Sequence, residues 1–240
     1  MKILILGGTG EARDLAARLT ALGHSVTTSL AGRTRDPALP AGHLRVGKFG
    51  GVPGLVGYLA AARFDRLVDA THPYAGLISV NAVAASRQTG IPLIRYMRPA
   101  WVEPEGAGWT NVESIAGAAA ALPRNATVLA TTGHEGLETL LARNDCSFLV
   151  RLIEPPLHPL PQHARLLLSR PPHALEEERA LLAREAVTHL VTKNSGGEAT
   201  AAKLQAARLA GVEVVMIARP VYGEATEAGT LDEAVAAILR

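Results

Sequence analysis

The stretch Met1–Ala12, MKILILGGTGEA, decides the fold that this sequence predicts. Its apolar run Ile3–Leu6 is short and uninterrupted, which is typical of a strand covered on both faces, as in a parallel sheet. A helical pattern of leucines follows and continues to Leu22. Three glycines separate the two patterns: Gly7, Gly8 and Gly10. A strand, a glycine turn and a helix in this order predict the start of a βαβ unit.

This turn has the composition of a phosphate-binding turn, because glycines let the backbone approach a diphosphate and helix-start N–H groups bind it. The spacing departs from the dinucleotide fingerprint. Counted from Gly8, Arg13 replaces the third small residue, and counted from Gly7, Thr9 replaces the second glycine. A tight turn without a ligand is the alternative. The candidate cofactor-binding residues here are Gly7, Gly8, Thr9, Gly10 and Glu11.

The end of the second predicted strand, His24–Ser29, bears on the choice of cofactor. NAD-binding sheets carry an acid there that binds the ribose hydroxyls, but no acid precedes Asp36 in this region. Arg33 and Arg35 are within reach instead, and a guanidinium pairs well with a phosphate dianion. We therefore predict NADPH/NADP+ as the cofactor, with Ser29 and Arg33 among its ligands. The alternative is that both arginines are solvated loop charges.

The composition is that of a soluble globular protein. The 240 residues are 48% hydrophobic, and 24 basic residues balance 22 acids along the chain, which speaks against nucleic-acid binding. A lone Cys146 allows no intrachain disulfide and is interpreted as a small core residue. The N-terminal apolar run is too short for a signal peptide, and no stretch suits a membrane span. We expect a cytoplasmic monomer without a bound metal.

Strands and helices alternate along the whole chain, which predicts an α/β protein with two Rossmann-like halves. Each half is expected to be a mainly parallel sheet flanked by helices, with the active-site cleft between them. A Pro- and Gly-rich piece, Arg98–Gly108, is interpreted as the linker. The halves are predicted as 1–100, which binds the dinucleotide, and 101–240, which contributes to the cleft.

Polar clusters follow four predicted strands, where ligands of open parallel sheets bind. Their members are Asp69, Thr71, His72 and Tyr74; Thr131, Thr132, Gly133 and His134; Arg170 and His173; and Lys193, Asn194 and Ser195. Helix capping is the alternative for the threonines, and a buried polar anchor is the alternative for Asp69. A lysine beside the pair Gly196-Gly197 suits an anionic ligand.

Several known mechanisms lack their residues in this sequence. No Tyr-x-x-x-Lys occurs, which speaks against a short-chain dehydrogenase or a sugar epimerase. Ser195 lacks the glycine two residues before it that a nucleophile elbow needs. The histidines show no zinc-type pair on a helix.

Six segments together resemble the precorrin-6A reductase family, in order and over essentially the whole chain. They are Gly7–Glu11, Gly47–Gly51, Asp69–Ala75, Thr131–Gly133, Ser169–His173 and Thr192–Gly197. The segments DATHPYA and TKNSGG are the more specific ones. A related reductase of the anaerobic route acts on cobalt-containing precorrin-6A, and the sequence separates the two poorly.

The resemblance implies NADPH-dependent hydride transfer to a conjugated double bond of the macrocycle, which yields precorrin-6B in aerobic cobalamin biosynthesis. Catalytic candidates are His72, Tyr74 and Lys193. Further cofactor-binding candidates are Thr71, Thr132 and Gly133. Because the macrocycle carries many carboxylates, cationic and hydrogen-bonding groups are expected to bind it. The substrate-binding candidates are Arg170, His173, Lys193, Asn194 and Ser195.

Two other classes of function remain as alternatives. The first is a non-catalytic NADP-sensing module, which would bind NADPH without oxidising it. The second is a nucleotide-sugar transferase with two Rossmann-like halves, which would bind a UDP-sugar but not NADPH.

Overall fold

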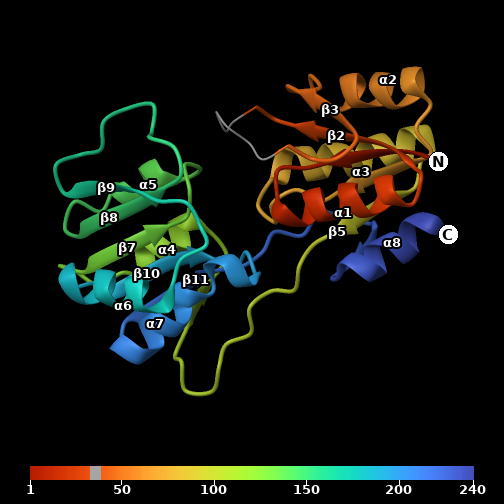
Figure 1. The fold of residues 1–240 in the computed structure, drawn as a ribbon. Helices are drawn as coiled ribbons and strands as arrows, with labels where there is room; N and C mark the ends of the chain where they lie inside the picture. Colours follow the sequence, from red (N-terminus) through yellow and green to blue (C-terminus); the bar gives the residue numbers. More distant parts are fainter. Residues whose placement is uncertain (33–38) are drawn as a thin grey trace. The chain divides into compact units, whose positions relative to one another are not determined.

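The computed structural model describes residues 1–32 and 39–240. The chain folds into two compact units (Figure 1). Unit 1 comprises Met1–Pro99 and Pro220–Arg240, and unit 2 comprises Ala100–Arg219. In the described part of the chain, no helix is both long and apolar enough to cross a membrane.

Within the described residues, unit 1 forms a six-stranded parallel sheet in the order β12-β5-β4-β1-β2-β3. Its strands are β1 (Lys2–Leu6), β2 (Ser25–Leu30), β3 (His43–Val46), β4 (Arg66–Asp69), β5 (Leu93–Tyr96) and β12 (Thr226–Ala228). Its helices are α1 (Gly10–Ala21), α2 (Val52–Ala62), α3 (Gly76–Thr89) and α8 (Leu231–Leu239).

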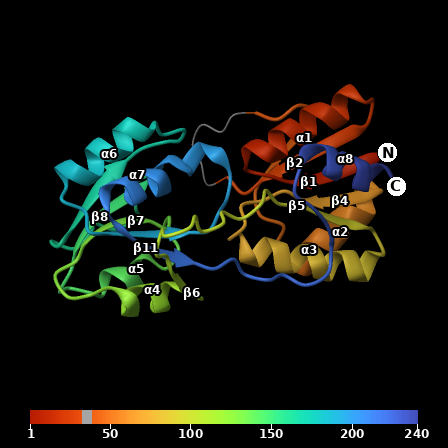
Figure 2. The same ribbon diagram turned by 90° about the horizontal axis from the view of Figure 1, so that it is seen from below.

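The apolar run of β1 is buried on both faces, as predicted for a central parallel strand. Ile3 and Ile5 pack in one core with α1 and α8, whereas Leu4 and Leu6 pack in the other with α2 and α3. Alternation of side chains along a strand makes this division. Figure 2 shows the two pairs of helices on opposite faces of this sheet.

Unit 2, over Ala100–Arg219, forms a second six-stranded parallel sheet in the order β6-β11-β10-β7-β8-β9. Its strands are β6 (Thr110–Val112), β7 (Thr127–Thr131), β8 (Ser147–Leu152), β9 (Ala164–Leu168), β10 (His189–Lys193) and β11 (Glu213–Ile217). Its helices are α4 (Ile115–Ala121), α5 (Leu137–Leu141), α6 (Leu175–Arg184) and α7 (Ala202–Ala210), with a 3-10 turn η1 (Glu198–Thr200).

The two units repeat one arrangement, with one piece moved in the sequence. β7, β8, β9, β10 and β11 follow the same spatial order as β1, β2, β3, β4 and β5. The sixth strand and its helix, β12 and α8, come last in unit 1, while the corresponding β6 and α4 come first in unit 2. The prediction of two mainly parallel α/β halves is thus confirmed.

The predicted extent of the second half, 101–240, is corrected by the structure, because the last 21 residues, Pro220–Arg240, belong to unit 1. β12 pairs with β5, so that Thr226 stands opposite Ile94. On α8, Ala234 and Ile238 are fully buried in the core beneath α1. This segment therefore belongs to unit 1, because it pairs with β5 and is buried in that core, although it follows unit 2 in the sequence.

Candidate functional site

The turn after β1 is held tightly on one side and open on the other. A Cβ at Gly7 would lie 2.8 Å from Cγ2 of Thr28 on β2, so only glycine fits there. Gly8 has a φ of +116°, and no described atom lies within 4 Å of the position of a Cβ. The turn therefore presents bare backbone at Gly8.

Thr9 joins this turn to both α1 and β4. Its Oγ1 accepts a hydrogen bond from the N–H of Ala12 at 3.1 Å, which makes Thr9 the N-cap of α1. The same hydroxyl donates to the carbonyl of Ala70 at 2.8 Å. Exposed backbone at Gly8 next to the start of a twelve-residue helix fits a dinucleotide diphosphate.

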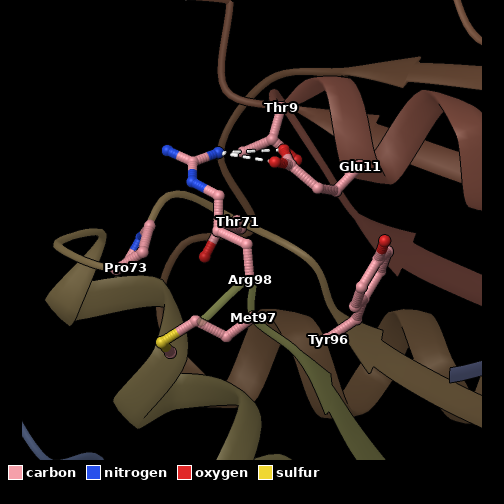
Figure 3. A pocket seen from close by; sticks show the side chains of 7 residues that line it. All are labelled: Thr9, Glu11, Thr71, Pro73, Tyr96, Met97 and Arg98. Atoms are coloured by element: carbon pink, nitrogen blue, oxygen red, sulfur yellow. Dashed lines mark hydrogen bonds and ion pairs between the residues drawn. The ribbon is translucent and has the colours of Figure 1, made fainter. Parts of the chain in front are cut away.

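A small pocket lies beside this turn at the carboxyl ends of β1, β4 and β5 (Figure 3). It is lined by Thr9, Glu11, Thr71, Pro73, Tyr96, Met97 and Arg98. Nη1 of Arg98 donates to both carboxylate oxygens of Glu11 at 2.9 Å. Burial raises the pKa of Glu11, but hydrogen bonds from backbone N–H and the Arg98 guanidinium outweigh it, and the pKa lies below its usual value.

The end of β4 is built around buried Asp69. Its Oδ1 accepts hydrogen bonds from the Oγ1 of Thr71 at 2.7 Å and from the N–H of Thr71 at 3.3 Å. Its Oδ2 lies 3.7 Å from Nε of buried Arg95. Asp69 is therefore the buried anchor that the sequence left as an alternative, and the Thr71 hydroxyl donates to it.

His72 and Tyr74 lie just beyond this anchor. Nδ1 of the exposed His72 accepts a hydrogen bond from the N–H of Tyr74 at 3.3 Å, and the two ring centroids are 5.8 Å apart. A neutral His72 consequently carries its proton on Nε2.

Arg45, which the sequence interpretation missed, lies on β3, where it stands opposite Ser29 of β2. Its Nη1 donates to Oγ of Ser29 at 3.1 Å, and its Nη2 donates to the carbonyl of Lys48 at 3.0 Å. The guanidinium lies 3.8 Å from the ring centroid of Phe49 and 5.1 Å from that of Tyr58. It thus brings a fixed cation to the predicted cofactor ligand Ser29, while Arg33 lies outside the described residues. Its place just before the Gly47–Gly51 turn was the available signal.

In unit 2, the turn after β7 presents side chains. Thr132 is 4% exposed, and its Oγ1 has no hydrogen-bond partner among the described residues. Gly133 has a φ of +78°. On the neighbouring β10, Nζ of Lys193 lies 3.9 Å from Oε2 of Glu135, and the lysine side chain is 12% exposed. Burial lowers the pKa of Lys193, and Glu135 opposes this shift.

The side-chain amide of Asn194 performs a structural task. Its Oδ1 accepts from the N–H of Trp101 at 2.8 Å, and its Nδ2 donates to the Trp101 carbonyl at 3.0 Å. The N–H of buried Ser195 donates to the carbonyl of Lys193 at 2.7 Å. Asn194 thereby ties the first residues of unit 2 to the end of β10, and its predicted role toward the substrate stays a prediction.

Arg170 and His173 lie in the loop between β9 and α6. Arg170, half exposed, donates to Oε1 of Glu154 at 2.6 Å. Burial lowers the pKa of His173, and the nearby Arg151 guanidinium lowers it further. At neutral pH, Arg170 is accordingly the charged member of this pair.

The structure groups the candidates that follow β1 and β4 in unit 1, and those that follow β7 and β10 in unit 2. In unit 1, the turns after β1 and β4 adjoin at the point where α1 and α3 leave on opposite faces. In unit 2, the ends of β7 and β10 adjoin in the same way. Such switch points are the usual ligand sites of open α/β sheets.

The comparisons with known proteins place this chain in a family and match its fold. The family model for precorrin-6x reductase CbiJ/CobK matches residues 2–239. A precorrin-6A reductase of Rhodococcus erythropolis is 46% identical over 99% of this chain and 96% of its own length. A cobalt-precorrin-6A reductase of Priestia megaterium is 29% identical over 99% of this chain and 98% of its own. The solved structure of a CobK precorrin-6A reductase matches with a TM-score of 0.93 and 40% identity, covering 100% of this chain and 96% of that one.

Proposed function

Because this chain belongs to the precorrin-6x reductase family, we propose that it reduces precorrin-6A to precorrin-6B with NADPH, as a step of cobalamin biosynthesis. Membership in a reductase family makes the chain an oxidoreductase, and its Rossmann-like first sheet indicates a nicotinamide cofactor. The choice of NADPH and of the macrocycle is the proposal.

The observation that carries the cofactor site is the bare backbone at Gly8, beside the capped start of α1. A diphosphate can approach this backbone, and a side chain there would fill the space. Ser29 and the fixed guanidinium of Arg45 support NADPH over NADH, since a cation at the end of β2 attracts the 2′-phosphate.

When bound, the cofactor supplies the hydride, which adds to one carbon of a conjugated double bond while a proton adds elsewhere in the π-system. His72 and Tyr74 are proposed to orient the reactants or to supply that proton, and neutral His72 holds one on Nε2. Lys193 and Arg170 are proposed to bind carboxylates of the macrocycle. The positioning of two bound molecules is then most of the catalytic task.

A second candidate substrate is cobalt-precorrin-6A, because the relative from Priestia megaterium that carries this substrate in its name matches over the full chain. The fixed guanidinium of Arg45 concerns only the cofactor and does not distinguish the two macrocycles.

The test is the absorbance of NADPH after anaerobic mixing of the protein with precorrin-6A, with NADH and cobalt-precorrin-6A in parallel samples. We expect NADPH oxidation and a shifted macrocycle spectrum with precorrin-6A. Oxidation only with the cobalt compound would replace the substrate. NADPH binding in a calorimeter without oxidation of either macrocycle would favour the sensing module instead.

A further inference from the structure

A carboxylate occupies the start of α1, where the cofactor diphosphate is proposed to bind. Glu11 lies in the first turn of this helix, directly after the N-cap Thr9 and Gly10. The helix-start N–H groups and the helix dipole attract any anion. Glu11 therefore competes with a diphosphate for these N–H groups and for the positive end of the dipole. An uncompensated carboxylate there would also repel the diphosphate.

Arg98 supplies the countercharge. One nitrogen makes both contacts: Nη1 lies 2.9 Å from each oxygen of Glu11, and Figure 3 shows the guanidinium reaching the carboxylate across the pocket. The two side chains are only 20% and 27% exposed, so solvent screens their charges less than those of a surface pair. Glu11 and Arg98 are also the only charged side chains among the residues described as lining this pocket.

The ionisation of Glu11 makes this countercharge necessary. Burial raises the pKa of Glu11, but backbone hydrogen bonding and Arg98 keep it below the usual value, so the group is a carboxylate at neutral pH. A carboxylate is therefore the form of Glu11 that an approaching diphosphate meets.

We propose that Arg98 is a positioning residue that neutralises Glu11 and thereby allows the start of α1 to accept the cofactor diphosphate. This inference rests on the proposed cofactor site. Under this proposal, the effect of removing Arg98 depends on the presence of Glu11. If Arg98 contacted the cofactor directly, the effect would not depend on Glu11.

The experiment is calorimetric titration of NADPH into the wild-type chain, Arg98→Met, Glu11→Gln and the double variant. We expect Arg98→Met to weaken binding about tenfold or more, and the double variant to recover to within about threefold of wild type. Glu11→Gln alone should bind about threefold more tightly, because this variant removes the carboxylate beside the diphosphate site while Arg98 stays in place. Arg87→Met is the matched control, since it breaks an exposed ion pair with Glu224 elsewhere in unit 1.

Four outcomes would overturn the inference. The first is that Arg98→Met binds NADPH as well as Arg87→Met does. The second is that the double variant stays as weak as Arg98→Met, which would indicate direct contact between Arg98 and the cofactor. If circular dichroism shows that Arg98→Met does not fold, the test rests on Glu11→Gln. Unchanged or weaker NADPH binding by Glu11→Gln would then contradict the proposal. A wild-type chain that binds neither NADPH, NADH nor pyrophosphate would overturn the cofactor site together with this inference, whereas failure of the variants alone leaves the site intact.

Discussion

After β1 the chain enters the twelve-residue helix α1 at Gly10, whereas after β7 it reaches the five-residue helix α5 only at Leu137. The first switch point therefore offers backbone N–H groups and a helix dipole. The second offers a buried hydroxyl, Thr132, and a nearly buried cation, Lys193. We therefore propose that one strand order carries two kinds of anion site: a backbone site suited to a diphosphate, and a side-chain site suited to carboxylates.

The largest effect is expected for Gly8→Val. The φ of +116° strains any β-branched residue, and the side chain would occupy the open space before α1, so NADPH affinity should fall at least about thirtyfold. Calorimetric titration measures it. Gly133→Val, also at positive φ but in the turn after β7, is the matched control, for which we expect a much smaller loss. An equal loss would mean that both turns hold cofactor, as the sequence prediction for Thr132 and Gly133 requires.

Lys193→Met should raise the Michaelis constant for precorrin-6A about tenfold and leave NADPH affinity unchanged, because this variant removes the cation of the side-chain site. Steady-state kinetics and calorimetry separate the two effects, and Lys193→Arg should retain most of the affinity. A loss of NADPH affinity instead would assign Lys193 to the cofactor. The two units would then not differ in the ligand that they bind.

The pH dependence of the Michaelis constant tests the same role of Lys193. Because burial lowers the pKa of Lys193, its charge is present at low pH and is lost on raising the pH sooner than for an exposed lysine. The Michaelis constant for precorrin-6A should therefore rise in the alkaline range, and Lys193→Arg should abolish that rise since arginine stays charged. A pH profile shared by both proteins would assign the titration to another group.

Arg45→Met should weaken NADPH binding about fivefold and hardly change NADH binding, because only NADPH carries the 2′-phosphate. Arg33→Ala is expected to act in the same direction. Titration with both cofactors measures the ratio. Equal losses would indicate that Arg45 only supports the Gly47–Gly51 turn through its bond to Lys48.

The smallest effect is expected for Thr132→Val, which removes a hydroxyl without a partner among the described residues. If a ligand uses that hydroxyl, precorrin-6A affinity should fall about threefold while thermal stability stays equal or rises. Thr28→Val is the control in unit 1, because Thr28 Oγ1 is likewise buried without a described partner. Unchanged precorrin-6A affinity in Thr132→Val, as in Thr28→Val, would show that neither hydroxyl serves this ligand.

The strand-end candidates could be found in the sequence because they directly follow apolar runs that are recognisable as strands. Arg45 and Arg98 could not be assigned in this way. Arg45 bonds to Ser29 across 16 positions, and Arg98 bonds to Glu11 across 87. The same holds for Asn194, whose amide pairs with Trp101 across 93 positions. Such partnerships depend on which strands become neighbours, and no local pattern records that.

The sequence by itself determined the α/β class, the parallel character of both sheets and the glycine turn after the first strand, because apolar periodicity and glycine placement are local properties. The tertiary structure alone decided that Pro220–Arg240 returns to unit 1, since the three residues of β12 carry no strand pattern and acquire one only by pairing with β5. It also decided which arginines meet which carboxylates and hydroxyls. Those choices are made by contacts between distant segments, and such contacts exist only in the folded chain.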